Sequence, residues 1–236
     1  MIRAVLFDLD GTLYRQTPLR ALMAAELATV PCLQPRPWRA ARVWRMLQAF
    51  RHAREELRAA GHAAEPLVRL QYSAAAERAG LPQRELEAVV AEWIFRRPLK
   101  YLRHVARPGT AALFDALSEQ GLQVGVFSDY PVDQKLQSLG LAGAASLTLE
   151  ATCDEVNAFK PHPRGFLHAC RQWGLAPAQV LYVGDRPEVD AAGAAAAGMP
   201  CAIVGGPPGA GYATVTAMAE LIGVVRQLRS RERTAS

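Results

Sequence analysis

Lysine is scarce in this 236-residue chain. Only Lys100, Lys135 and Lys160 stand against 24 arginines, so arginine is the usual cation and each lysine is unusual. Lys160 precedes Pro161, and Pro163 follows two residues later, which indicates a loop. A compact ammonium can neutralise an anion without the forked geometry that a guanidinium imposes. A solvated loop lysine is the simpler interpretation, and only the neighbouring motifs favour a functional one.

Long apolar runs and paired cysteines are also missing. No apolar run approaches the roughly 20 residues of a membrane-spanning helix. Met1 leads directly into a strand-like segment, which leaves no room for a signal peptide. The four cysteines form no C-x-x-C pair, which is typical of reduced thiols and not of structural zinc; they are Cys32, Cys153, Cys170 and Cys201. We therefore expect a cytoplasmic globular protein that does not act at a membrane.

Aspartate is absent from residues 15–105. This segment holds 16 lysines and arginines against eight glutamates, a net charge of +8, whereas the rest of the chain has a net charge of −3. Such an excess of cations could attract phosphorylated substrates, although solvated helix faces in an arginine-rich protein explain it more simply. No nucleic-acid-binding motif accompanies the charge, so we expect no nucleic-acid partner.

The same segment has the pattern of a helical unit. Breaks at residues 31–37, at Gly61 and at residues 80–82 divide it into about four helices. The clearest helix runs from about Pro37 to Ala60. Apolar residues at helical spacing predict one buried face along it; they are Ala40, Val43, Trp44, Leu47, Phe50 and Leu57.

The first strand-like segment ends in two acids. Residues 4–7 are all apolar, which predicts a buried parallel strand, and Asp8, Asp10, Gly11 and Thr12 follow. Side chains alternate along a strand, so Asp8 and Asp10 should lie on one face where the strand opens into a loop. Two close carboxylates can bind a divalent cation, divide nucleophile and acid roles, or do both. The structural alternative is an ordinary Asp-Gly turn.

A second apolar run ends in a hydroxyl. Residues 122–127 lead to Ser128 and Asp129, and Pro131 begins a plausible helix. A serine hydroxyl is a neutral donor for a phosphate oxygen, but serine and aspartate also cap helices well. Both roles are compatible, because the N-terminus of a helix itself binds anions.

A third run, residues 180–184, ends at Asp185, with Asp190 five residues further on before a helix of small residues. Asp190 can simply cap that helix, whereas a pure turn role explains Asp185 less well. One doubly wound parallel sheet would bring Asp185, Asp8 and the serine to the same edge, with Lys160 on a neighbouring loop. The sequence therefore predicts an α/β fold whose polar groups converge on a single site.

Taken together, these segments resemble the signature of the haloacid dehalogenase superfamily of phosphotransferases. The signature consists of D-x-D-G-T at residues 8–12, a strand-end serine at Ser128, Lys-Pro at residues 160–161, and G-D-x-x-x-x-D at residues 184–190. The resemblance covers residues 1–14 and about 105–205. Two positions depart from the commoner pattern: Asn157 stands where glycine is frequent, and His162 stands where many relatives have an acid.

The resemblance implies a division of the chain. Residues 1–14 and 106–230 would form a Rossmann-like core with a doubly wound parallel sheet. Residues 15–105 would be an inserted α-helical cap that rocks over the site on hinges near residues 14–17 and 105–109. Residues 231–236 are expected to be a disordered, charged tail.

The resemblance also implies a Mg²⁺-dependent phosphatase of a small phosphorylated metabolite. Asp8 would attack phosphorus and form an aspartyl-phosphate, and Asp10 would act as general acid and then as general base. The expected metal ligands are Asp8, the backbone carbonyl of Asp10, and Asp185, while Asp190 either joins the metal or orients its surroundings. The expected phosphate-binding residues are Ser128, Asp129 and Lys160, of which Ser128 and Lys160 also count as catalytic.

Other functions remain open at this point. A sugar-phosphate mutase uses the same four motifs and is the leading alternative. A dehalogenase would not need Asp10 or a metal, and a phosphonate hydrolase of this family needs a cap lysine, for which only Lys100 is available. A catalytically silent binding protein on the same fold is the alternative from a different class. The expected partner is a small phosphorylated substrate, and the protein is expected to be a monomer or a homodimer.

Overall fold

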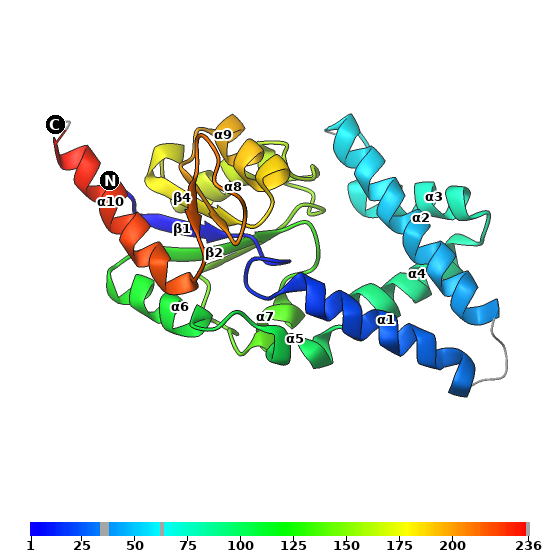
Figure 1. Ribbon diagram of the computed structural model, residues 1–236. Helices are drawn as coiled ribbons and strands as arrows, with labels where there is room; N and C mark the ends of the chain where they lie inside the picture. The colour runs from blue at the N-terminus through cyan, green and yellow to red at the C-terminus, as the bar shows by residue number, and fades with distance from the viewer. Residues whose placement is uncertain (34–37, 62–63, 235–236) are drawn as a thin grey trace.

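A six-stranded parallel sheet forms the core of one half of the protein (Figure 1). The computed structural model describes residues 1–33, 38–61 and 64–234. The strands lie in the order β3-β2-β1-β4-β5-β6. Their bounds are Ala4–Phe7 for β1, Gln123–Ser128 for β2, Leu147–Glu150 for β3, Val180–Gly184 for β4, Cys201–Val204 for β5 and Ala213–Val215 for β6.

Strand β1 lies at the centre of this order. Its last residue, Phe7, is opposite Val126 of β2 on one side and Val183 of β4 on the other. The chain moves outward from β1 in both directions, so the strand order reverses there. In open α/β sheets such a reversal leaves a crevice at the carboxyl ends of the strands, where ligands bind. The predicted doubly wound α/β fold is confirmed.

Helices cover both faces of the sheet because β1 is apolar on both sides. Val5 and Phe7 face a cluster with α6, α7 and α10, while Ala4 and Leu6 face a cluster with α8 and α9. The bounds of these helices are Thr110–Glu119 for α6, Asp133–Leu139 for α7, Arg164–Trp173 for α8, Ala192–Ala197 for α9 and Leu221–Thr234 for α10. Short helical turns complete this part of the chain: η2 (Pro177–Gln179), η3 (Pro187–Ala191) and η4 (Met218–Glu220).

Residues 16–105, which we call the helical insert, are helical, and α2, α3 and α4 lie to one side of the sheet (Figure 1). The elements are α1 (Gln16–Leu33), α2 (Trp38–Ala60), α3 (Leu67–Ala79), α4 (Gln83–Val90), the π-helical turn η1 (Ala91–Arg96) and α5 (Leu99–Val105). Helices α2, α3 and α4 share a small core of their own, which includes Met46, Phe50 and Leu86. Leu19 and Leu102, by contrast, pack into the core of the sheet. Across the described ranges, none of the helices has the length and apolar composition needed to cross a membrane.

The buried face of α2 differs in part from the prediction. Leu47 and Phe50 are buried, but Trp44 is 49% exposed. Met46 and Ala53, which the predicted stripe omits, are buried instead. The stripe is rotated because α3 and α4 contact α2 on the side of Met46, and sequence spacing cannot show where those partners lie. The predicted start of this helix at Pro37, like part of the break at residues 31–37, lies outside the described residues.

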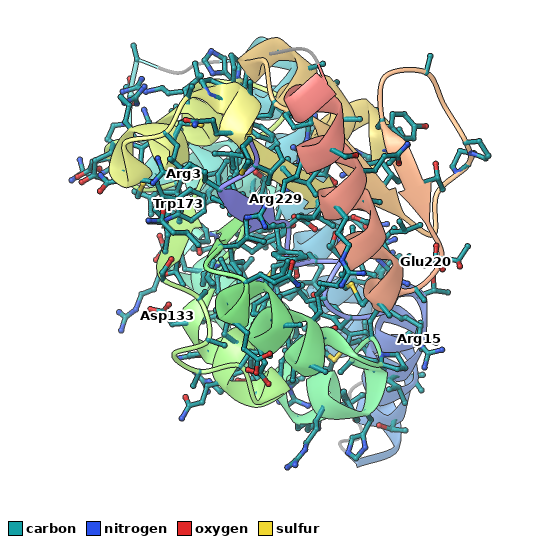
Figure 2. All side chains as sticks on the ribbon, turned by 90° about the vertical axis from the view of Figure 1, so that its left-hand side faces the viewer. Arg3, Arg15, Asp133, Trp173, Glu220 and Arg229 are labelled. Carbon is teal, nitrogen blue, oxygen red and sulfur yellow. The ribbon has the colours of Figure 1, made fainter. Side chains whose placement is uncertain are left out.

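Helix α10 continues to Thr234, through four of the residues that the sequence predicts to be a disordered tail. Apolar residues at its start, Leu221 and Val225, are buried against the sheet. Arg229 then donates from Nε to the carbonyl oxygen of Ile2 at 3.0 Å (Figure 2). A helix that is anchored in this way extends easily through arginine and glutamate, which are good helix formers. Residues 235–236 lie outside the described residues.

Two short segments join the helical insert to the sheet. Arg15 N donates to Val105 O at 2.8 Å, and Arg107 N donates to Leu13 O at 3.0 Å. Tyr14 and Ala106 thus form an antiparallel bridge. The two expected hinges are therefore hydrogen-bonded to each other, and their hinge role stays a prediction.

Candidate active site

Asp8 lies at the carboxyl end of the central strand. Its backbone N–H donates to Val183 O at 2.7 Å, which keeps it in line with β4, and its side chain is buried. Thr12 donates from Oγ1 to Asp8 Oδ2 at 2.9 Å. Gly11, between them, has a φ of 106°, and a side chain there would collide with the Asp185 carboxylate. The Asp-Gly-Thr order therefore allows the chain to turn and brings two strand ends into contact.

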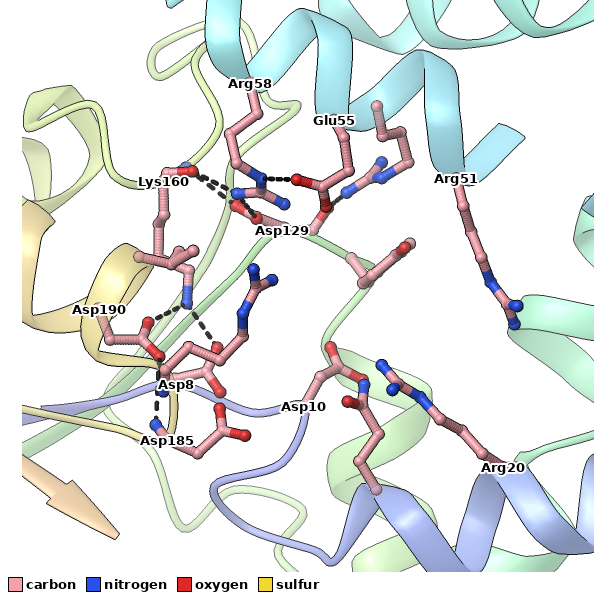
Figure 3. A pocket seen from close by; sticks show the side chains of 15 residues that line it. Asp8, Asp10, Arg20, Arg51, Glu55, Arg58, Asp129, Lys160, Asp185 and Asp190 are labelled. Atoms are coloured by element: carbon pink, nitrogen blue, oxygen red, sulfur yellow. Dashed lines mark hydrogen bonds and ion pairs between the residues drawn. The ribbon is translucent and has the colours of Figure 1, made fainter. Parts of the chain in front are cut away.

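Lys160 connects two of the carboxylates. Its Nζ donates to Asp8 Oδ1 at 2.5 Å and to Asp190 Oδ1 at 2.8 Å (Figure 3). It also donates to the Tyr182 hydroxyl at 2.9 Å. Burial alone would lower the pKa of Lys160, but Asp190 and Asp8 outweigh it and hold that pKa well above its usual range. Lys160 is therefore a buried cation with all three N–H donors in use.

Burial raises the pKa of Asp8 well above its usual value, and the neighbouring carboxylates Asp190, Asp185 and Asp10 add to that effect. Lys160 opposes it without cancelling it. The Asp8 carboxylate is thus close to more negative charge than one lysine can neutralise, and an additional cation would favour its ionised form.

Asp190 uses both oxygens within the protein. Oδ1 accepts from Lys160 and, at 3.2 Å, from the Tyr182 hydroxyl. Oδ2 accepts from the backbone N–H groups of Asp185 at 3.1 Å and of Arg186 at 3.0 Å. The residue therefore fixes the loop after β4 and orients Lys160, and it does more than cap the next helix.

Asp185 offers the clearest place for a metal ion. Its Oδ1 is a buried side-chain oxygen that, among the described residues, has no hydrogen-bond partner. Burial and the nearby Asp190 raise its pKa from 3.8 to about 6. Oxygen atoms of Asp8, Asp185 and Asp190 lie within 4.8 Å of one another. A set of carboxylate oxygens with one free, buried acceptor fits a small divalent cation such as Mg²⁺.

Asp10 is held by a second group of side chains. Its Oδ1 accepts from Lys135 Nζ at 2.5 Å and from the Tyr14 hydroxyl, and its Oδ2 accepts from Ser128 Oγ at 3.0 Å. Although burial would raise the pKa of Asp10, the Lys135 ammonium and these hydrogen bonds lower it. Ser128 Oγ also accepts from Tyr130 N at 3.0 Å. The strand-end serine thus positions Asp10 in this structure.

Asp129 connects the site to the helical insert. Its Oδ2 accepts from Arg58 Nη1 at 2.8 Å, and its Oδ1 accepts from the backbone N–H of Lys160 at 3.2 Å. Arg54, buried between the rings of Tyr130 and Phe159, donates to the Asp129 carbonyl oxygen at 2.7 Å. Two arginines of α2 therefore reach the loop that carries Asp129.

These groups surround a cavity of about 170 Å³. Asp8, Asp10, Lys160, Asp185 and Asp190 all line it, so predicted residues from three separate segments lie together (Figure 3). Asp129 also lines the cavity, while Ser128 reaches it through its bond to Asp10. Four arginines of the helical insert complete the wall: Arg20, Arg51, Arg54 and Arg58.

Several residues of the site were not predicted. Lys135 and Tyr14 bind Asp10, Tyr182 binds Lys160, and Arg54 and Arg58 contact the Asp129 loop. The rarity of lysine was a usable signal for Lys135, because a chain that prefers arginine has a reason for each lysine. Tyr14 lies only four residues after Asp10, but it belongs to no motif. The contacts of Tyr182, Arg54 and Arg58 depend on which elements meet.

Asn157 accounts for one departure from the common pattern. It has a φ of 44°, a left-handed conformation that glycine adopts freely and asparagine tolerates. Its Oδ1 accepts from Leu67 N at 2.6 Å, and its Nδ2 donates to Glu65 O at 3.0 Å. The asparagine thus adds a link to the helical insert that glycine could not make.

A family model described as haloacid dehalogenase-like hydrolase matches residues 2–198. The chain belongs to this family. Among the curated relatives of this hydrolase, the phosphoglycolate phosphatase of Salmonella choleraesuis is 32% identical over 237 residues, covering 93% of this chain and 86% of that protein. The phosphoserine phosphatase of Thermus thermophilus is 29% identical and covers 84% of this chain and 86% of its own length. The phosphoglycolate phosphatase of Salmonella typhi is 35% identical, but only over half of each chain.

Solved structures share the architecture of this hydrolase. A 2-haloacid dehalogenase from Pseudomonas syringae pv. Tomato DC3000 has a TM-score of 0.66 and 25% identity, covering 96% of this chain and 99% of that one. A HAD phosphatase from Thermococcus onnurineus has a TM-score of 0.64 and 23% identity, covering 95% and 98%. The predicted family is confirmed, and the fold is common to relatives with different reactions.

Proposed function

We propose that this hydrolase cleaves phosphate monoesters with the help of Mg²⁺, through a phosphoryl group bound covalently to Asp8. The observation that carries the proposal is the pair of carboxylates Asp8 and Asp10 in one cavity, each with its own lysine. Halide displacement needs a single nucleophilic carboxylate, whereas phosphoryl transfer also needs a group that exchanges a proton with the leaving alcohol.

In the first step Asp8 Oδ attacks phosphorus, and the bond from phosphorus to the ester oxygen breaks. The leaving oxygen takes a proton from Asp10, and the Lys135 ammonium, at 2.5 Å from Asp10 Oδ1, is a cationic donor that can share one with it. In the second step Asp10 accepts a proton from the water that attacks phosphorus, and Asp8 is released together with inorganic phosphate.

Lys160 stays cationic throughout and neutralises charge on the transferring phosphoryl group. Ser128 donates to a phosphoryl oxygen when Asp10 turns toward the leaving group, and Asp129 offers its backbone N–H. Its own carboxylate is already bound to Arg58.

Asp8, the backbone carbonyl of Asp10 and the free Oδ1 of Asp185 would hold the Mg²⁺ ion, while Asp190 orients Lys160 and the loop after β4. When bound, the ion offsets the repulsion between the Asp8 carboxylate and the phosphate. The helical insert serves as a cap that keeps bulk water from the covalent intermediate.

Purified protein tested against a panel of phosphate monoesters and 2-chloropropionate decides between the reactions. We expect release of inorganic phosphate that stops when the metal is chelated, and no release of chloride. Chloride release without metal would contradict the proposal. Phosphorus NMR of the products also separates a hydrolase from a sugar-phosphate mutase, which would yield an isomeric sugar phosphate and need a bisphosphate activator.

A further inference from the structure

A second cavity, of about 350 Å³, lies beside the catalytic one. The apolar part of its wall comes largely from three elements of the helical insert, with Met23 and Leu27 from α1, Trp44 from α2, and Trp93 and Ile94 from η1. A volume of this size falls in the range of roughly 300–1,000 Å³ that is typical of small-molecule sites.

The two cavities share a border. Asp10, Arg20 and Arg51 line both of them, as do Gln16 and Tyr130. Figure 3 shows Arg20 on α1 and Arg51 on α2, both on the Asp10 side of the catalytic cavity. An ester whose phosphorus lies next to Asp8 has its leaving oxygen next to Asp10, so the rest of the alcohol extends across this border into the apolar cavity.

Trp44 indicates what occupies that cavity. Its indole is 49% exposed, although Met46 and Leu47, close to it on the same helix, are buried. A large exposed aromatic side chain on a cavity wall is typical of a surface that an apolar ligand covers.

The charges at the border restrict the ligand further. Of the described residues that line the second cavity, Asp10 is the only acid, against the cations Arg20, Arg51 and Lys135. Asp10 is already bound to Lys135. This net positive charge would repel an ammonium group on the substrate, whereas it would attract the phosphate and would not repel an uncharged body.

We propose that the substrate is a phosphate monoester of an alcohol with an uncharged apolar body, such as an aromatic ring or a branched aliphatic group, that fills this second cavity. The inference rests on the proposed phosphatase function. A short polar alcohol such as glycolate would leave the cavity empty and Trp44 uncovered.

A series of esters of primary alcohols tests the proposal, because the acidity of the leaving group then changes little. The series consists of ethyl, butyl, benzyl and 2-naphthylmethyl phosphate, with phosphoglycolate and phosphoserine for comparison. One methylene in a fitting apolar pocket changes kcat/KM by about tenfold or more. We expect kcat/KM to rise at least about a hundredfold from ethyl to benzyl phosphate, with both polar esters below benzyl phosphate.

Neighbouring alanines on α1 provide a matched pair of variants. Ala24 lines the second cavity, whereas Ala25 does not, and both are exposed. Ala24→Trp fills the cavity and should lower kcat/KM for benzyl phosphate at least about tenfold more than for ethyl phosphate. Ala25→Trp should change both values equally and by less than about twofold. The proposal would be overturned if kcat/KM were the same for all esters of the series. It would also be overturned if the ratio of kcat/KM for benzyl phosphate to that for ethyl phosphate were the same in both variants.

A binding measurement keeps this test separate from the proposed reaction. Benzylphosphonate, which cannot be hydrolysed, is titrated by calorimetry against the wild-type protein, Ala24→Trp and Ala25→Trp, with methylphosphonate as the control ligand. Benzylphosphonate should bind at least about tenfold more tightly than methylphosphonate to the wild-type protein and to Ala25→Trp. This preference should be absent in Ala24→Trp. If no ester is hydrolysed but this pattern holds, the proposed function fails and the apolar site stands. If esters are hydrolysed without this pattern, the apolar site fails alone.

Discussion

Asp8, the proposed nucleophile, is buried at a strand end and bound to both Thr12 and Lys160. Asp8→Asn keeps the size of the side chain but removes its charge and nucleophilicity. We predict that kcat falls by more than about 10⁴-fold, beyond the effect of losing acid–base help alone. Circular dichroism should be unchanged. Asp115→Asn, at an exposed position of α6, is the control and should keep full activity. An Asp8→Asn variant with a tenth of the wild-type kcat would contradict the assignment.

Asp185 makes the stability of the metal-free protein depend on pH. Burial raises its pKa from 3.8 to about 6, so the folded state keeps this proton at a pH where the unfolded state has lost it. Between these two values the folded state binds more protons, and the free energy of unfolding contributed by this group therefore falls as pH rises from about 4 to about 6.

Asp185→Asn removes this contribution. We predict that the variant gains stability relative to the wild-type protein as pH rises from about 4 to about 7, as measured by urea unfolding with a chelator present. A difference that stays constant or decreases over this range would show that the carboxyl group is not protonated preferentially in the folded state.

At the scale of single elements, strands were easier to predict than helix faces. Strand β1 is buried on both sides, so its apolar run identifies it without knowledge of its neighbours, and the acid after it marks the carboxyl edge of the sheet. Helix α2 was found by its spacing, but Trp44 was assigned to the wrong side. Which face of a helix is buried depends on where its partners contact it, and those partners are distant in sequence.

The same reasoning explains the missed contacts of the site. Asp10 was predicted from its own motif, yet its partner Lys135 lies on α7, and its partner Tyr14, four residues further along the chain, belongs to no motif. No spacing rule connects a residue of α7 with a loop 125 residues earlier. Motifs therefore identified the main polar side chains that meet in the cavity, whereas tertiary structure was needed to find the groups that position them.

The helical insert supplies arginines to the cavity, which leads to a prediction at the level of elements. Arg51 on α2 lines both cavities, whereas Arg45 on the same helix lines neither. Arg51→Gln should change KM unequally among substrates, because it lies where the alcohol part passes. Lys160→Met should lower kcat/KM for every ester by a similar factor, because all esters present the same phosphoryl group.

The measurement is kcat/KM for several esters with each variant, with Arg45→Gln as the control for lost charge on the helix surface. If Arg51→Gln lowered kcat/KM for all esters by one common factor, the insert would act as a general lid. The prediction that it determines substrate choice would then be wrong.

For the whole molecule, the central question is charge balance at the edge of the sheet. Asp8, Asp185 and Asp190 lie together, and Lys160 forms ion pairs with Asp8 and Asp190. A ligand that binds only the folded state stabilises it in proportion to the logarithm of its concentration. Mg²⁺ should therefore raise Tm of the wild-type protein, and the increase should be absent in Asp185→Asn.

Ca²⁺, which prefers more ligands at longer distances, should raise Tm but inhibit turnover. Full activity in excess chelator would contradict the metal site.

Capture of the covalent intermediate tests the account most directly. Enzyme mixed with a phosphate monoester labelled at phosphorus is quenched in acid within one turnover, digested, and analysed by mass spectrometry. We predict a phosphoryl group on Asp8 that appears before inorganic phosphate, disappears on a chase with unlabelled ester, and is absent in Asp8→Asn. Hydrolysis at the full rate with no label on Asp8, or with the label on another residue, would contradict the account.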